Sequence, residues 1–161
     1  MELNKNGIFT VKSAYKVHYE YKRRNRVRAV GAATSSGTRD DRFWKELWKI
    51  TRPRKMVHFM WRFSHNSLAL HVNLKRRGMK LDTRCVLCGR YDEDGSHLFF
   101  KCKYVKKVWA ELNLDQIRQS LVNAQPAREV VEIILKLKED VQCQVIILLY
   151  FWWSERCGVR E

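Results

Sequence analysis

Long apolar runs are missing from this chain of 161 residues. The longest, Val145–Trp153, has nine residues, whereas a membrane-spanning helix needs about 20. The first residues, Met1–Gly7, are polar and lack the apolar core of a secretory signal peptide. We therefore expect neither a membrane protein nor a secreted one, but an intracellular protein of the nucleus or the cytoplasm.

Acidic side chains are also scarce. The sequence has 17 Asp and Glu residues against 32 Lys and Arg residues, which gives a formal net charge of +15. Residues 1–107 carry 26 basic and 9 acidic side chains, or +17, and residues 108–161 carry 6 and 8, or −2. Such a field favours polyanions, nucleic acid first and an anionic membrane surface second, unless the charge merely keeps the protein in solution. Hydrophobic residues make up 45%, which is enough to build a core.

The cysteines do not form the even set of a disulfide framework. There are five, and an odd number without a signal peptide argues against disulfide pairing. Three of them, at positions 85, 88 and 102, lie close together. The other two, Cys143 and Cys157, stand far downstream, where we expect core or surface thiols.

Apolar periodicity predicts a mainly α-helical fold. The spacing i, i+3, i+4 and i+7, typical of a buried helical face, occurs in residues 56–63. We predict one short extended segment at residues 7–11 and helices at residues 12–21, 42–50, 53–63, 67–77, 104–112, 128–138 and 141–153. Residues 29–41 have the composition of a linker, and residues 113–127 that of an irregular connection. The last helix is apolar nearly all round, so it is either central to the core or lacks a partner.

One group of side chains has the spacing of a metal site. The pattern C-x2-C-x8-H-x4-C is formed by Cys85, Cys88, His97 and Cys102. Two residues between the first cysteines let one tight turn present both sulfurs to one ion, and Gly89 lets the backbone curl past the second sulfur. Three thiolates and one imidazole make a closed structural shell that favours zinc over magnesium or calcium. We therefore predict one structural Zn²⁺ ion, the alternative being three buried free thiols and a histidine.

The gap between His97 and Cys102 poses a geometric problem. On a regular helix these side chains would point about 140° apart, so one of them must lie at a helix end or in a turn. We expect His97 to open a short helical turn that carries Leu98 and Phe99 inward. The acidic run at residues 92–94 is interpreted as a solvated loop, the alternatives being competing oxygen ligands or groups that support the ligands.

Four blocks of sequence carry a resemblance to a known family. In chain order they are Gly7–Tyr15, Phe43–Trp48, Pro53–Arg62 and Cys85–Trp109. Over roughly residues 7–112 the chain resembles the zinc-binding domain that follows the reverse transcriptase in plant LINE-type, non-LTR retrotransposon polyproteins. The resemblance implies that the four ligand positions above hold zinc. A ribonuclease-H-like domain often follows in such polyproteins. Residues 151–156 of this chain resemble the helix that links to that domain.

The composition and the resemblance together predict three parts. Residues 1–41 form an N-terminal arm, a short helix and a flexible linker. Residues 42–112 form the zinc-binding helical domain, with a zinc knuckle at residues 85–102, and residues 113–161 form C-terminal helices that remain from a link to a following domain. The predicted fold class is mainly α: a small helical domain with an embedded zinc knuckle and a short N-terminal extended segment.

Motifs of catalysis are missing as well. The chain has no Walker-type glycine loop, and Asp40 and Asp41 lack the hydrophobic hairpin and third acid of a two-metal polymerase site. We expect these two residues to cap a helix. The prediction is a module that is not an enzyme and has no small-molecule substrate and no membrane partner.

Two functions remain, from different classes. The first is a nucleic-acid-binding module that holds template RNA or target DNA near a polymerase. Its phosphate contacts would come from the basic side chains around the predicted zinc site, namely Lys75, Arg76, Arg77, Arg84, Lys101, Lys103, Lys106 and Lys107. Phe99, Phe100 and Trp109 would either stack on bases or pack in the core. The second is a structural module, stapled by zinc, whose apolar C-terminal helix contacts a protein partner.

Overall fold

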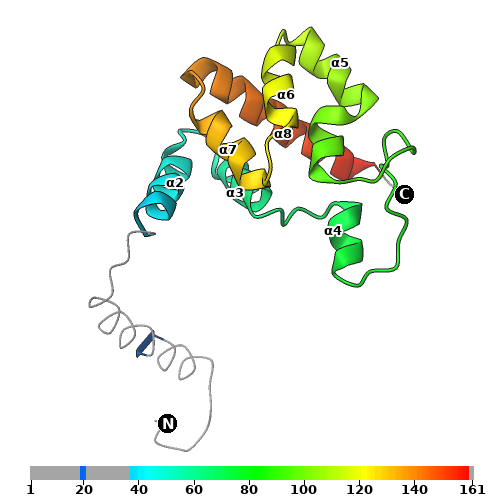
Figure 1. The fold of residues 1–161 in the computed structure, drawn as a ribbon, viewed down its shortest axis with the longest axis horizontal. Coiled ribbons are helices and arrows are strands. Elements are labelled where there is room, and N and C mark those ends of the chain that lie inside the picture. Colours follow the sequence, from blue (N-terminus) through cyan, green and yellow to red (C-terminus); the bar gives the residue numbers. More distant parts are fainter. Residues whose placement is uncertain (1–18, 21–36, 160–161) are drawn as a thin grey trace, which may run out of the picture. The chain divides into compact units, whose positions relative to one another are not determined.

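The computed structural model describes residues 19, 20 and 37–159 (Figure 1). Contacts between residues divide the chain into two units, Met1–Arg42 and Phe43–Glu161. Of the predicted first helix, residues 19 and 20 are described and helical. The rest of that helix, the extended segment at residues 7–11 and the linker before residue 37 lie outside the described residues.

Helices account for most of the described chain. They are α2 (Gly37–Lys49), α3 (Arg54–Ser64), α4 (His71–Arg76), the π-helical turn η1 (His97–Lys101), α5 (Lys103–Glu111), α6 (Asp115–Val122), α7 (Ala127–Leu135) and α8 (Glu139–Gly158). The described residues contain no strand, and a single antiparallel bridge joins Arg84 to Asp92. The predicted mainly α fold is confirmed. No helix in this part of the chain is both long and apolar enough to cross a bilayer.

Helix α4 begins later than predicted but ends where predicted, before Gly78. It begins at His71 rather than at residue 67, because the hydroxyl group of Ser67 donates to the carbonyl oxygen of Arg62 at 3.0 Å and caps no helix. Gly78 ends it with a φ of +93°. The N–H of the next residue, Met79, returns to a carbonyl oxygen in the last turn of the helix, as in a Schellman motif.

Helix α6 was not predicted. It occupies much of the segment that we interpreted as an irregular connection, and that interpretation is wrong. Its apolar pattern is weak, because Leu121 is its one buried residue. A local ion pair supports its first turn, where Arg118 donates to Asp115 at 2.6 Å. Helix α2 also begins earlier than predicted, at Gly37 rather than at residue 42.

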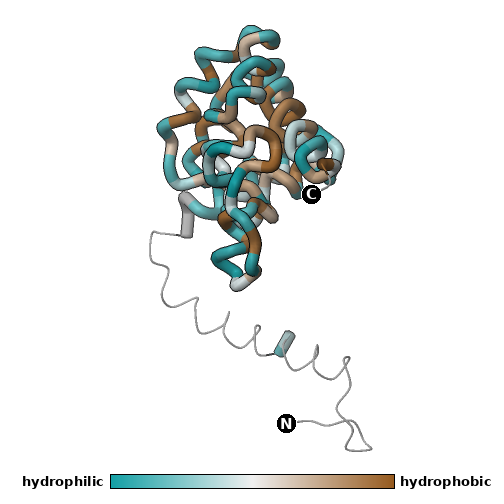
Figure 2. The backbone as a smooth tube through the Cα atoms, turned by 90° about the vertical axis from the view of Figure 1, so that its right-hand side faces the viewer, coloured by the Kyte–Doolittle hydropathy of each residue, from teal (hydrophilic) through white to brown (hydrophobic). Residues whose placement is uncertain are grey.

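Helix α8 is central to the core of the second unit. It contacts both α3 and α7, and its residues Val145, Ile146 and Leu149 are almost completely buried. Figure 2 shows hydrophobic and hydrophilic residues alternating along the helices of this unit, as expected for helices that bury one face. Of the two alternatives for the last helix, the structure therefore supports the central position. Residues on both sides of position 113 share one core, and the predicted boundary there remains a prediction.

Candidate metal centre

The four predicted ligands meet at one point. Their sulfur and nitrogen atoms all lie within 4.8 Å of one another, and Cys88 Sγ lies 3.3 Å from His97 Nε2. In a tetrahedral site with Zn–S bonds of about 2.3 Å and Zn–N bonds of about 2.0 Å, the ligand atoms are about 3.5–3.8 Å apart. Small side-chain movements therefore close the cluster around an ion. The donor set, three thiols and one imidazole, and this spacing fit one structural zinc ion.

The first two cysteines lie in a tight turn between paired backbone segments. Beside the Arg84–Asp92 bridge, the N–H of Cys85 donates to the carbonyl oxygen of Tyr91 at 2.8 Å. Within the turn, the N–H of Gly89 donates to the carbonyl oxygen of Cys85 at 2.8 Å. Gly89 has a φ of +64°, a conformation that favours glycine. The expected role of Gly89, to let the chain curl past the second sulfur, is confirmed.

The π-helical turn η1 solves the problem of the last two ligands. In a π-turn the hydrogen bond runs from residue i+5 back to residue i, and here the N–H of Cys102 donates to the carbonyl oxygen of His97 at 2.8 Å. The carboxylate of Asp94 accepts the N–H of His97 at 2.6 Å, which fixes the start of the turn. Leu98 and Phe99 are fully buried. The expectation that His97 opens a short inward-facing turn is therefore confirmed.

Burial keeps two of the thiols protonated when no metal is bound. Burial raises the pKa of Cys85 to about 12, although nearby backbone N–H groups oppose the shift. Burial also raises the pKa of Cys102. At Cys88 burial acts in the same direction, but the N–H groups of Arg90 and Tyr91 outweigh it and lower the pKa. Metal binding must therefore displace protons from the buried thiols, which makes it pH-dependent.

The histidine is held in the form that binds a metal. Burial lowers the pKa of His97, and the cationic side chains of Lys101 and Lys106 act in the same direction. The carboxylates of Asp94 and Glu93 oppose the shift but do not cancel it. A neutral imidazole has a lone pair on one ring nitrogen, and Nε2 is the nitrogen that faces Cys88.

The acidic run is the exposed loop that we expected at Asp92 and Asp94, but not at Glu93. Glu93 is completely buried and accepts hydrogen bonds from the backbone N–H groups of His71 at 3.2 Å and Val86 at 3.4 Å. Arg156 of α8 also donates to Glu93, from Nε at 3.0 Å. None of the acidic side chains belongs to the described ligand cluster. Glu93 and Asp94 support the ligands from outside, through hydrogen bonds to the backbone N–H groups of Val86 and His97. For the buried Glu93, such partners also offset the cost of burying a carboxylate.

Three helices supply donors to the carbonyl groups of η1. The indole N–H of Trp152 donates to Leu98 at 2.9 Å, and that of Trp109 donates to Phe99 at 2.9 Å. Arg118 donates to the carbonyl oxygen of Phe100 at 3.1 Å. These donors come from α8, α5 and α6, so the turn that carries His97 is held by residues far along the chain. The sequence offers no local signal for these contacts.

Part of the predicted basic surface lines a hollow next to the ligands. This knuckle hollow has a volume of about 450 Å³ and is lined by Cys88, Arg90, Tyr91, His97, Lys101, Lys103 and Lys106. No acidic residue lines it. Tyr91 is 66% exposed, and its ring centroid lies 5.5 Å from that of His97. Arg90 and Tyr91 were missed as candidates, although both lie within three residues of Cys88.

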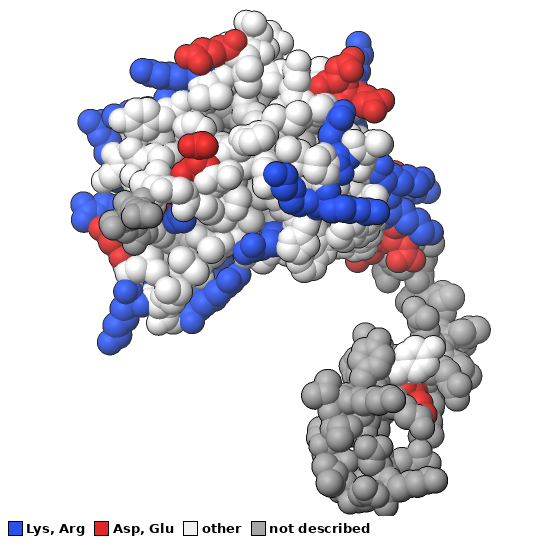
Figure 3. Space-filling view, turned by 180° about the vertical axis from the view of Figure 1, so that it is seen from behind, with Lys and Arg blue, Asp and Glu red and all other residues white. Residues whose placement is uncertain are grey.

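The other basic candidates lie elsewhere, and all of them are exposed. Lys107 is on α5, and Lys75, Arg76 and Arg77 end α4 or follow it. Arg77 donates to a carbonyl oxygen, and Arg84 forms an ion pair with Asp82 at 2.7 Å. On the face shown in Figure 3, lysine and arginine side chains form several groups with acidic side chains among them. Charge alone therefore defines no single binding face.

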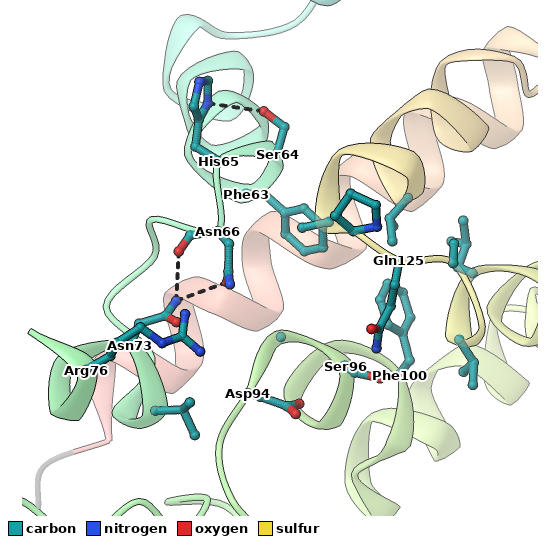
Figure 4. Close-up of a pocket in the computed structure, with 18 residues that line it drawn as sticks. Phe63, Ser64, His65, Asn66, Asn73, Arg76, Asp94, Ser96, Phe100 and Gln125 are labelled. Carbon is teal, nitrogen blue, oxygen red and sulfur yellow. Dashed lines mark hydrogen bonds between the residues drawn. The ribbon is translucent and has the colours of Figure 1, made fainter.

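Arg76 lines a different hollow, of about 530 Å³, formed by residues of α3, α4 and η1 and by the segment between α6 and α7. Figure 4 shows Arg76 and Asn73 on one side of it and Ser96 and Gln125 on the other. The amide of Asn73 donates to Asn66, as the dashed lines in the figure indicate. This hollow does not contain any of the four ligands.

The three aromatic residues for which we considered both stacking on bases and packing in the core belong to the core. Phe99 and Trp109 are fully buried, and Phe100 is 2% exposed. Core packing therefore accounts for them, and none presents a ring to a base. The remaining downstream thiols, Cys143 and Cys157, are outside the cluster, the first half-buried and the second exposed.

A helical unit built around a Cys3His cluster defines a zinc-binding module. The chain belongs to the family described as zinc-binding in reverse transcriptase, whose model matches residues 9–109. That span ends within α5, so α6, α7 and α8 lie beyond it. A search of curated proteins found no match, and a search of solved structures found none either.

Proposed function

We propose that this chain is a non-catalytic zinc-binding module of a plant LINE-type retrotransposon reverse transcriptase polyprotein, or of a fragment derived from one, and that it binds nucleic acid. It would bind template RNA or target DNA, in the nucleus or the cytoplasm. Membership of a reverse transcriptase family supports this role, since such polymerases work on nucleic acid. The observation that carries the proposal is the knuckle hollow.

The knuckle hollow combines two chemistries that single-stranded nucleic acid uses. Arg90, Lys101, Lys103 and Lys106 provide four cations without an acidic neighbour among the lining residues, which suits phosphate groups. Tyr91 presents an exposed ring on which a base can stack. The other basic candidates, Lys75, Arg76, Arg77, Arg84 and Lys107, lie outside this hollow and would contact phosphates further along the bound nucleic acid.

The test is quantitative binding to matched single-stranded RNA and DNA oligonucleotides across a salt series. The logarithm of affinity should fall linearly with the logarithm of salt concentration, with a slope of about −0.7 per phosphate contact. The variant Lys101→Gln/Lys106→Gln should flatten the slope by about 1.4, whereas the exposed control pair Lys136→Gln/Lys138→Gln should not change it. Absence of binding to either strand at low salt would contradict the proposal.

A second candidate function is a protein contact made by α8. Ile147 is 37% exposed and Phe151 is 50% exposed, and their spacing of four residues places them on one face of the helix. That face would pack against the polymerase or a following ribonuclease-H-like domain. Co-expression with either neighbour, followed by analytical ultracentrifugation, should show a complex that Ile147→Ser/Phe151→Ser dissociates.

A further inference from the structure

Trp48 differs from the other five tryptophans. Trp109 and Trp152 each donate an indole N–H to a carbonyl oxygen, and Trp153 packs against Phe99. Trp44 and Trp61 have ring contacts with His65. Trp48 is 45% exposed, and within the described residues its ring has no hydrogen bond, no stacked ring and no cation above it. Of the six indoles, this one therefore presents a ring that a ligand can reach.

The open ring lines a shallow hollow of its own. This turn hollow has a volume of about 490 Å³ and is lined by Trp48, Lys49, Ile50, Thr51, Arg52, Pro53 and Arg54, at the link between α2 and α3. No acidic residue lines it. In the part of the chain that the structure describes, the side chains of Lys49, Arg52 and Arg54 have no ion pair and no hydrogen bond.

The backbone of the link between α2 and α3 is anchored. Phe43 and Leu47 of α2 are buried, so the helix is anchored by its inner face while Trp48 lies outside. Between the helices, the N–H of Arg52 donates to the carbonyl oxygen of Ile50 at 2.9 Å. A short link anchored at both ends fixes the positions from which the ring and the cations extend, which lowers the backbone entropy lost on binding.

We propose that the turn hollow is a second binding site for single-stranded nucleic acid, in which a base stacks on Trp48 and phosphates contact Lys49, Arg52 and Arg54. An exposed ring among cations suits a single strand, whose bases are open to stacking, better than a duplex. This proposal rests on the proposed nucleic-acid-binding function. The turn hollow and the knuckle hollow have no lining residue in common. One strand that reaches both hollows would bind more tightly than either hollow alone allows.

The first experiment is photocrosslinking of the full chain to oligonucleotides that carry 5-iodouracil, as RNA and as DNA, with the crosslinked peptides mapped by mass spectrometry. We expect adducts on Trp48. Adducts on Tyr91 without Trp48 would overturn this inference and leave the proposed function standing. Adducts on Trp48 alone would support it and contradict the role of the knuckle hollow. No adduct, together with no binding, would overturn both.

The second experiment compares variants in oligonucleotide affinity. Trp48→Ala should weaken binding at least about five-fold, and Trp48→Phe, which keeps a ring, should restore much of it. Tyr19→Ala removes another exposed ring outside both hollows and should have no effect. Lys49→Gln/Arg52→Gln/Arg54→Gln should flatten the salt slope by about 2. Equal affinities for wild type and Trp48→Ala, or displacement by polyglutamate as effective as by unlabelled strand, would overturn the proposal.

Discussion

Two regions of the molecule meet at the metal centre: the residues up to Trp109, which the family model matches, and the helices α6, α7 and α8 that follow. All four ligands belong to the first region, within 18 residues of sequence. The second region supplies Arg118, Trp152 and Arg156, which hold the carbonyl groups of η1 and the buried carboxylate of Glu93. A metal-binding pattern can therefore be local in sequence while its support is not.

The comparison predicts that loss of the ligands has the largest effect. Metal binding is worth about 10–16 kcal/mol in small zinc modules, and no side chain between residues 86 and 92 is fully buried. Cys88→Ser should abolish binding of the single zinc ion, measured by native mass spectrometry, and unfold at least residues 85–102, measured by hydrogen exchange.

The matched control is Cys157→Ser, because that thiol is exposed and lies outside the cluster. It should keep one zinc ion and the wild-type unfolding curve. A wild-type chain that is fully folded after metal removal by a chelator would show that the zinc ion is not structural.

The next effect tests the link across the two regions. Arg156→Met leaves the carboxylate of Glu93 buried without its cation, which costs about 3–5 kcal/mol for a buried pair. Zinc affinity should also fall about 10- to 100-fold, because Glu93 holds the backbone N–H of Val86, which lies between the first two ligands. Urea unfolding and a zinc competition assay measure the two losses.

Adding Glu93→Gln to Arg156→Met should recover part of the stability, since the uncompensated charge is then removed. Arg84→Met breaks an exposed ion pair with Asp82 and serves as the control, with no measurable change expected. If Arg156→Met changed stability and zinc affinity as little as Arg84→Met, then α8 would lie beside the metal centre without supporting it.

A smaller effect is expected from the indole donors. Trp109 lies at the end of the matched region and Trp152 lies well beyond it, yet they bond to adjacent carbonyl groups of η1. Trp109→Phe and Trp152→Phe each leave one carbonyl oxygen without its donor, which costs about 1–3 kcal/mol where the group is buried. Equal losses in urea unfolding would show that the end of the family match is not a structural boundary, and a neutral Trp152→Phe would show that it is.

These contacts also show which parts of the metal centre could be predicted from the sequence. Cys85, Cys88, His97 and Cys102 were predictable because their chemistry is expressed in short spacings. The burial of Glu93 was not, because its partner Arg156 lies 63 residues away. The same holds for the turn hollow, since nothing in the sequence distinguishes an exposed tryptophan from five engaged ones.

The helices could also be predicted only where the signal is local in sequence. The face of α3 was predictable from its strong period, and the end of α4 from Gly78. The weakly patterned α6 was missed because its formation depends on one buried leucine and on polar contacts. The π-turn escaped prediction as a backbone type, although the 140° mismatch between its two ligands showed that a regular helix could not hold them.

The smallest expected effect is a pH dependence in α6. The hydrogen bond from Arg118, aided by Gln119, holds the pKa of Asp115 below its usual value. The folded state therefore favours the ionised carboxyl group, so its contribution to stability is present at neutral pH and is lost as the pH falls through the depressed pKa. Asp115→Asn should destabilise the protein slightly in urea unfolding at neutral pH and match the wild type once the pH has fallen below the depressed pKa. Because Arg118 also bonds to Phe100, a difference that persisted in acid would show that Asp115 positions this arginine by geometry rather than by charge.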